Sequence, residues 1–245
     1  VSEDTSVVVF AVHGMDNNVT DMFSMTFLPE LLYRYNFPGK FGLARGKLGV
    51  KPRSLLTNPR RKSWSGEVWQ RRYHPNPLKR LLMPWIPSKY DRLLGKGEEP
   101  ALSSPYELRE QGIPLNWMPA MWYQRHWSKM KAFALPAFAA GHIRINLQGR
   151  EENGIVALSE YEAICEELTQ SLYRLTDGRT GKPIVKDVVR TRTIDNALSN
   201  EPALPDPDLI VLWQDEPSDV VDSPDFGRIG PVTYYRSGGH RPDGF

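Results

Sequence analysis

The sequence predicts an α/β fold built on a layered sheet, because strand-like and helix-like segments alternate along the chain. Residues 141–147 alternate strictly between apolar and polar side chains, and residues 208–213 form a short apolar run. Between them, residues 159–175 carry an apolar side chain every three or four positions, as an amphipathic helix does. These three observations predict a sheet with a covering helix in the second half of the chain.

The N-terminal unit has the pattern of a strand, a loop and a helix. Residues 7–12 are mostly β-branched and read as a buried strand, and residues 13–18 read as a loop. A helix is expected to begin near Thr20 or Asp21, since both are good capping residues. Its apolar stripe would consist of Phe27, Leu28, Leu31, Leu32 and Tyr35.

The other elements follow from the same periodicities. We expect a helix over 117–131 and a strand over 184–189, with loop from 214 onward. The strand at 141–147 should face inward through Ile143, Ile145 and Leu147. The helix that Ser159 would cap should bury one face: Tyr161, Ile164, Cys165, Leu168, Leu172 and Leu175.

Length and composition are those of a globular protein. The 245 residues are enough for one large core or two small ones, and no run approaches the ~18 apolar residues of a membrane span. Cys165 is the sole cysteine and is expected to be a small buried hydrophobe. The chain starts at Val1 without a signal-peptide pattern and stops inside a glycine-rich motif. We therefore expect a piece of a longer protein, and its compartment stays open.

Charge is distributed unevenly along the chain. Residues 40–100 hold fifteen Lys or Arg against four Asp or Glu, a balance of +11, so the rest carries −9 of the total of +2. The same stretch is rich in Trp and Tyr, and Pro and Gly recur throughout residues 36–115. We expect 36–115 to be an insertion or cap on a domain formed by 1–35 and 116–245, with short helices near 78–83 and 89–95.

Two interpretations of the basic, aromatic stretch stay open. It could bind an anionic substrate, with Arg60, Arg61, Arg71 and Arg72 attracting phosphate and the aromatic rings adding contact area. It could instead be a solvated insertion whose tryptophans pack onto the core. Nucleic acid is not an expected partner, because no nucleic-acid-binding motif accompanies the charge.

Two of the five histidines occupy positions suited to a metal site. His13 directly follows the first predicted strand, and ligands gather at the carboxyl ends of strands in open α/β sheets. His240 follows Gly238 and Gly239, which would let the backbone approach a metal or phosphate closely. Imidazole suits zinc and related metals. Spacing alone leaves open that both are structural or surface residues.

Several blocks together resemble the alkaline phosphatase superfamily, in particular its type I phosphodiesterase and nucleotide pyrophosphatase group. Residues 141–156 contain His-Ile-Arg-Ile-Asn-Leu-Gln-Gly-Arg-Glu and then Gly-Ile-Val, similar to a block of that group. Residues 207–211, Pro-Asp-Leu-Ile-Val, resemble its Pro-Asp-Leu strand. Residues 13–15, His-Gly-Met, resemble its central motif, and residues 239–244 resemble its C-terminal Gly-x-His loop.

The resemblance implies a three-layer α/β/α sandwich, incomplete at both ends, and a two-metal phosphoester hydrolase. In that family a Ser or Thr attacks phosphorus while two cations, expected to be zinc ions in the complete enzyme, stabilise the oxygens of an in-line displacement. Carried over by motif, His13 would bind one metal and His240 the other. The implied partner is an anionic phosphoester, and the oligomeric state stays open.

Two departures from the family pattern bear on activity. The family's Asp before the central His is Val12 here, which cannot ligate a metal, and Asp16 or Asn17 would have to replace it. The family's nucleophile lies upstream of the central motif, where this chain has only twelve residues. We expect the chain alone to be inactive, and the alternative function is a non-catalytic binding module with an eroded metal site.

The remaining candidates have ordinary structural explanations. His142 alternates with the inward residues of its strand and is expected to face outward or toward another layer. His74 and His126 lie among aromatic and basic residues and read as surface or packing positions. Arg150 and Glu151, which follow the strand, read as a structural ion pair in preference to a functional one.

Overall fold

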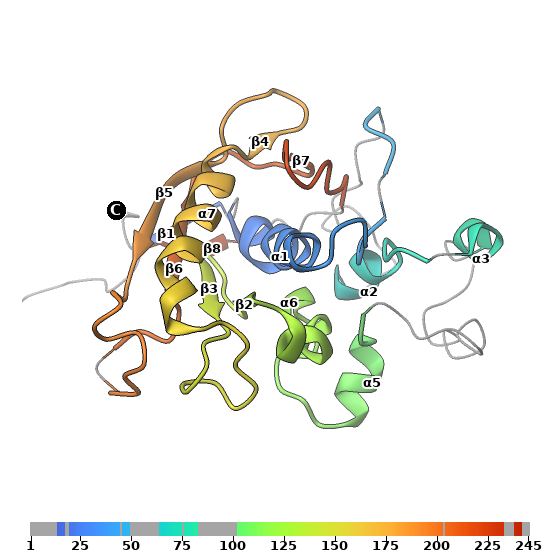
Figure 1. The fold of residues 1–245 in the computed structure, drawn as a ribbon. Helices are drawn as coiled ribbons and strands as arrows, with labels where there is room; N and C mark the ends of the chain where they lie inside the picture. Colours follow the sequence, from blue (N-terminus) through green and yellow to red (C-terminus); the bar gives the residue numbers. More distant parts are fainter. Residues whose placement is uncertain are drawn as a thin grey trace, which may run out of the picture.

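The computed structural model describes residues 14–17, 20–44, 46–49, 64–74, 76–82, 102–202, 204–232 and 238–241. The chain is mixed α/β, with helices packed against a sheet of four strands, and Figure 1 shows their arrangement. The sheet runs in the order β2 (Ala132–Leu135), β3 (Gly141–Ile145), β6 (Leu209–Trp213), β5 (Val185–Arg190), and every neighbouring pair is antiparallel.

The two faces of this sheet differ in burial. Ile143 and Val211 lie on the inner face and are fully buried. His142 and Ile210, which pair across β3 and β6 on the opposite face, are only half-buried, and Val189 beside them is 41% exposed. This is the alternation that residues 141–147 predicted, and the predicted inward residues Ile143, Ile145 and Leu147 are all completely buried.

The N-terminal helical unit covers the inner face. It consists of η1 (Phe23–Phe27), a π-helical segment, and α1 (Leu28–Asn36), so the helix expected near Thr20 is confirmed. Gly141 of β3 lies so close to Leu28 and Trp213 that an added Cβ would meet them at 2.7 and 2.9 Å. The indole of Trp213 also donates a hydrogen bond to Ser24 Oγ at 2.8 Å. Sheet and helix therefore interlock at this point.

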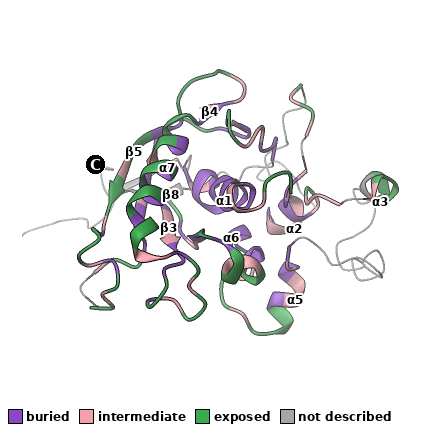
Figure 2. Ribbon diagram, viewed as in Figure 1, coloured by how far each residue is buried: buried purple, intermediate pink, exposed green. Residues whose placement is uncertain are grey.

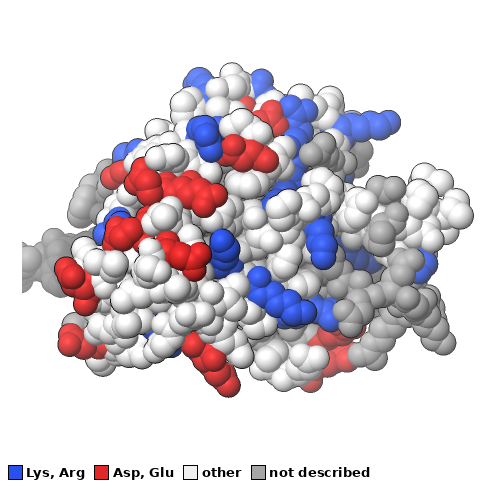
Figure 3. Space-filling model, viewed as in Figure 1, with Lys and Arg blue, Asp and Glu red and all other residues white. Residues whose placement is uncertain are grey.

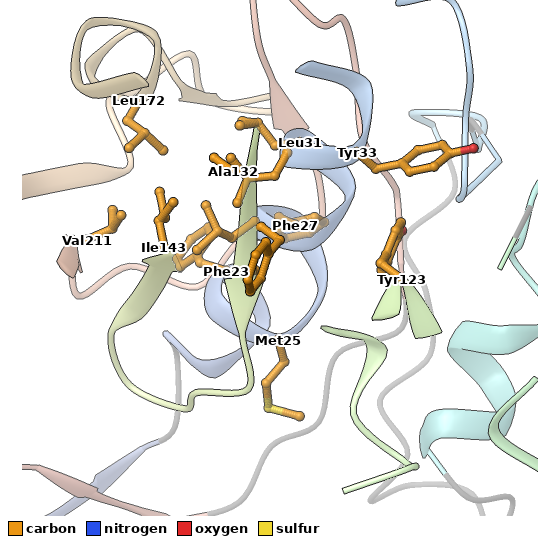
Figure 4. Packing of buried hydrophobic residues seen from close by; sticks show 14 of the residues in the cluster. Phe23, Met25, Phe27, Leu31, Tyr33, Tyr123, Ala132, Ile143, Leu172 and Val211 are labelled. Atoms are coloured by element: carbon orange, nitrogen blue, oxygen red, sulfur yellow. The ribbon is translucent and has the colours of Figure 1, made fainter. Parts of the chain in front are cut away.

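The second helix on the inner face is α7 (Tyr161–Tyr173), preceded by the 3₁₀ turn η6 (Leu158–Glu160). Its predicted inward residues, Cys165 among them, are buried. Tyr35 of α1 donates a hydrogen bond to Glu167 of α7 at 3.0 Å, so the two helices lie side by side. Figure 4 shows Leu31 and Leu172 from these helices approaching Ile143 and Val211 of the sheet.

The described part of the expected insertion contributes to the same core. Its helices are α2 (Trp64–Trp69), α3 (Pro77–Leu82) and α5 (Pro105–Glu110). Trp69 is buried and meets Trp122 edge-on, with ring centroids 5.3 Å apart. The expected helix near 78–83 is confirmed as α3, whereas 89–95 lies outside the described residues. Figure 2 shows α2 partly buried and α3 exposed.

Several predictions of local structure were wrong. The expected loop 13–18 contains a strand, β1 (Gly14–Asn17), which pairs with β8 (Gly238–Arg241) in the expected C-terminal loop. The helix expected over 117–131 is broken into α6 (Pro119–Trp122) and the 3₁₀ helix η5 (Gln124–Lys129). Proline lacks an N–H and stands in the first turn of a helix, so α6 begins only at Pro119.

Two short elements complete the described fold. β4 (Thr176–Asp177) pairs with β7 (Val221–Asp222), another strand within the expected C-terminal loop. None of the described helices is long and apolar enough to cross a membrane. The predicted strand 7–12 lies outside the described residues, and the predicted strands at 184–189 and 208–213 are confirmed as β5 and β6.

Candidate functional site

Two segments that are far apart in the sequence, residues 14–17 and residues 238–241, pair in the β1–β8 ribbon. Its antiparallel register pairs Gly14 with Arg241, Met15 with His240 and Asp16 with Gly239. His13 immediately precedes this ribbon and lies outside the described residues. The pairing therefore brings the segment that follows His13 next to the backbone of His240.

The sequence of the ribbon suits a close approach of two backbones. Gly238 and Gly239 form half of β8, and glycine in a strand commonly marks a place where another backbone or a ligand approaches closely. Both segments were predicted to be loops, because neither shows the alternation of apolar and polar side chains that indicates a strand. The pairing is a long-range contact, which periodicity within either segment does not report.

The two histidine motifs at this ribbon would supply some, but not all, of the ligands that a zinc site needs. Imidazole nitrogen is a common zinc ligand, with a bond of roughly 2.0–2.1 Å. His13 and His240 would supply two such donors, and Asp16, three residues after His13, is carried by β1 opposite Gly239. Within the described residues there is no group of three or more His, Cys, Asp or Glu side chains that could hold a metal. Two imidazoles fit zinc and leave its further ligands unassigned.

A second cluster is centred on Asp208, and the sequence analysis anticipated only its Arg150–Glu151 pair. Its carboxylate is completely buried and accepts hydrogen bonds from both terminal nitrogens of Arg150, each at 2.7 Å. Tyr161 Oη donates to it at 2.7 Å, and the backbone N–H of Ile145 donates at 2.7 Å. Burial raises the pKa of Tyr161, and the negative charge of Asp208 raises it further.

This cluster joins two of the sequence blocks on which the family resemblance rests, residues 141–156 and residues 207–211. Arg150 also donates to the carbonyl oxygens of Ile145 and Ala197, at 2.7 and 2.9 Å. Glu151 accepts from Arg150 at 2.9 Å and from Arg144 at 2.6 Å. These contacts tie Arg150 and Glu151 to the end of β3, the residue before β6, α7 and the loop at Ala197, so the geometry supports the structural interpretation of Arg150 and Glu151.

A third buried cluster was not foreseen from the sequence. Glu30 on α1 is completely buried, and it accepts hydrogen bonds from Arg34 Nε at 2.7 Å and Tyr123 Oη at 2.6 Å. The backbone N–H groups of Gly42 and Leu43 also donate to it. Burial raises the pKa of Glu30, and the Arg34 guanidinium opposes that rise. The available signal was the i, i+4 pair of Glu30 and Arg34 on an otherwise apolar helix.

The other histidines have individual environments. His142 is half-buried on the outer face of the sheet, where burial lowers its pKa and Asp206 opposes the effect. His74 Nδ1 accepts a hydrogen bond from the backbone of Asn76 at 3.1 Å. The ring of His126 packs beside Tyr33 and Phe37. These positions agree with the packing interpretation made from the sequence.

The basic stretch is described only in part. Arg60 and Arg61 lie outside the described residues. Arg71 is exposed, whereas the guanidinium of Arg72 lies over the Trp69 ring, 4.5 Å from its centroid. Trp64 is also buried, so these two tryptophans pack onto the core as the second interpretation expected.

Comparisons with models of protein families, with curated proteins and with solved structures found no match to this chain. The resemblance to the alkaline phosphatase superfamily therefore rests on the sequence blocks themselves. Its implications for fold and activity are hypotheses.

Proposed function

We propose that this chain is part of a metal-dependent phosphoesterase of the alkaline phosphatase superfamily, acting on a phosphodiester or a related anionic phosphoester. In the complete protein the described sheet would belong to the three-layer α/β/α sandwich of that superfamily. The observation that carries the proposal is the β1–β8 ribbon, which pairs Met15 with His240. It draws together the two sequence motifs that the resemblance associates with metal ligands.

The proposed roles follow from the donor chemistry. His13 and His240 would each hold one of two divalent cations, zinc being the first choice because neutral imidazole suits it. Such cations polarise a phosphoryl oxygen and stabilise the attacking and leaving oxygens of the displacement. The nucleophile would come from a part of the protein outside this chain.

The second candidate function is a non-catalytic binding module that keeps the fold with an incomplete metal site. Val12 favours it, because a valine stands where the family has a ligating Asp. The two candidates differ in a measurable property. The enzyme requires metal bound through both histidines, whereas the binding module does not.

Zinc binding by the 245-residue chain tests the proposal. In isothermal titration calorimetry, His13→Ala and His240→Ala should each weaken zinc binding, while His142→Ala on the outer face of the sheet serves as the matched control. Far-UV circular dichroism would verify that each variant is folded. If all three variants bound zinc as the unaltered chain does, the assignment of His13 and His240 would be wrong.

Hydrolysis gives a complementary test. The chain alone should not turn over bis(p-nitrophenyl) phosphate, because the proposed nucleophile lies outside it. Turnover that is lost in His240→Ala would contradict this part of the proposal and place the whole catalytic apparatus within the chain.

We further propose that residues 40–100 form a cap that selects anionic substrates. Clustered Lys and Arg would raise the local concentration of phosphoester, and salt would screen the effect. In the complete enzyme, joint neutralisation of Arg60, Arg61, Arg71 and Arg72 should lower kcat/KM and flatten its salt dependence. If kcat/KM and its salt dependence were unchanged in a folded variant, residues 40–100 would not select the substrate.

A further inference from the structure

Helix α3 presents a continuous apolar face to solvent. Leu78, Leu81 and Leu82 are 70%, 69% and 51% exposed, the first two being the most exposed large hydrophobic side chains in the described part of the chain. Their spacing of i, i+3 and i+4 places them on one side of the helix. We call these three side chains the leucine face.

The leucine face contrasts with the apolar surfaces of the other helices. Residues of α1 and α7 at the same spacing are buried against the sheet, whereas α3 extends away from it (Figure 1). Figure 2 shows α3 as exposed over most of its surface. Single exposed apolar residues are ordinary, but three together on one short helix mark an interaction surface.

Positive charge accompanies this face. Lys79 and Arg80 occupy the helix between the leucines, and Arg71 is exposed shortly before it in the chain. Residues 40–100 as a whole carry fifteen cationic side chains against four acidic ones. In Figure 3 the end of the molecule where α3 lies shows a group of uncharged atoms with Lys or Arg atoms beside it.

We propose that α3 docks this chain on an anionic lipid bilayer, with the leucine face inserted among the headgroups, Lys79 at the lipid surface and the positive charge of the basic stretch attracting the lipid. A bilayer accepts a shallow apolar insertion supported by cations, and each cation near the surface contributes roughly 1 kcal/mol to binding. A stable protein interface buries about 800 Å² on each partner, more than three leucines on a six-residue helix supply. Lipid is therefore the favoured partner. Docking on lipid through α3 does not depend on the proposed metal site.

Vesicle binding tests the docking directly. The full 245-residue chain should bind phosphatidylcholine vesicles that contain phosphatidylglycerol, bind pure phosphatidylcholine more weakly, and dissociate as salt is raised. Replacement of the leucine face by Leu78→Ser, Leu81→Ser and Leu82→Ser should weaken binding by at least about 100-fold, since each buried leucine is worth roughly tenfold. Lys79→Glu with Arg80→Glu should lower it by at least about 25-fold, roughly fivefold for each cation.

A matched control separates insertion at α3 from general loss of surface hydrophobicity. Ile155, Ile194 and Leu198 are 42%, 41% and 42% exposed and lie outside the basic stretch. Their joint replacement by serine should leave vesicle binding unchanged. Because the α3 leucines are exposed, their variants should also unfold at the same urea concentration as the unaltered chain.

Three outcomes would overturn the proposal. The first is equal binding by the leucine-face variant and the control variant. The second is equal binding to both vesicle compositions at every salt concentration. The third is no vesicle binding together with concentration-dependent dimerisation that the leucine-face variant abolishes, which would make α3 a contact between two copies of the chain.

Discussion

The buried pair of Arg150 and Asp208 should be worth far more to stability than a surface pair of the same geometry. Both side chains are completely buried, and Asp208 also satisfies Tyr161 Oη and the N–H of Ile145. Replacement of Asp208 by alanine would leave the Arg150 cation in the interior with Glu151 as its remaining anion. The free energy of unfolding should therefore fall sharply in Asp208→Ala.

The expected loss can be estimated from these contacts. Removal of one partner of a buried ion pair costs roughly 3–5 kcal/mol. Each buried donor left without an acceptor costs about 1–3 kcal/mol, although relaxation makes such terms less than additive. We therefore predict a loss of at least about 3 kcal/mol, a large part of the 5–15 kcal/mol typical of a folded domain.

The chain contains a matched control for this experiment. Asp222 accepts from Arg228 Nε and Nη2, both at 2.7 Å, but the two side chains are 34% and 35% exposed. Exposed pairs contribute about 0–1 kcal/mol, so Asp222→Ala should have little effect. Urea unfolding followed by circular dichroism would measure both variants under identical conditions.

A double-mutant cycle identifies the source of the loss. Arg150→Met combined with Asp208→Ala removes the stranded cation, so the double variant should be more stable than the sum of the single losses predicts, by roughly 2 kcal/mol. If Asp208→Ala lost no more stability than Asp222→Ala, this explanation of how the sequence blocks are held together would fail.

Three further predictions concern packing and titration. Gly141→Ala should lower the free energy of unfolding by about 1–3 kcal/mol, because its Cβ would collide with Leu28 and Trp213. Gly49 has open space around it, so Gly49→Ala should be nearly neutral. Equal effects of the two substitutions in urea unfolding would contradict the packing. Burial acts to raise the pKa of Asp177, but hydrogen bonds from Ser218 and Thr180 outweigh it and hold the pKa below 3.8. The stability that ionised Asp177 contributes above pH 3.8 should therefore be lost as pH falls through the lower folded pKa. Urea unfolding of Asp177→Asn should lack this loss, and an equal loss in that variant would refute the assignment. Burial lowers the pKa of His142 below 6.5 despite the nearby charge of Asp206, so nuclear magnetic resonance should show its imidazole titrating below that value. The free energy of unfolding should fall as pH drops from 6.5 toward the folded pKa. Titration at or above 6.5 would show the ring to be solvated.

Periodicity was sufficient to predict most of the sheet and its main helices. The alternation in 141–147 places Ile143 and Ile145 on the buried face, and the apolar spacing of α7 gives its inward side. Both signals are local, because strand and helix geometry fix which side chains share a face. Pairing order and antiparallel direction are long-range properties, so the sequence did not reveal them.

The candidate site was predicted less completely than the fold. Its motifs were recognisable from the sequence, but the β1–β8 ribbon was not, because Gly238 and Gly239 carry no side chain from which alternation could be read. Glu30 was missed for a different reason. A buried carboxylate is recognised by its partners, and Tyr123, Gly42 and Leu43 come from other parts of the chain.

The sequence left open whether the tryptophans of the irregular region enter the core. Frequent Pro and Gly made 36–115 look like an addition to the domain, yet Trp64 and Trp69 are buried. A tryptophan in a basic segment can either contact a ligand or pack in the core, and composition does not distinguish the two. Arg72 illustrates the point, since its cation covers Trp69.

X-ray absorption at the zinc edge tests the proposed metal centre most directly. We predict that the zinc-loaded chain has imidazole nitrogens as ligands at roughly 2.0–2.1 Å, and that this signal disappears when His13 and His240 are both replaced by alanine but persists in His142→Ala. A zinc environment containing only oxygen ligands, or an imidazole signal unchanged in the double variant, would contradict the proposed function.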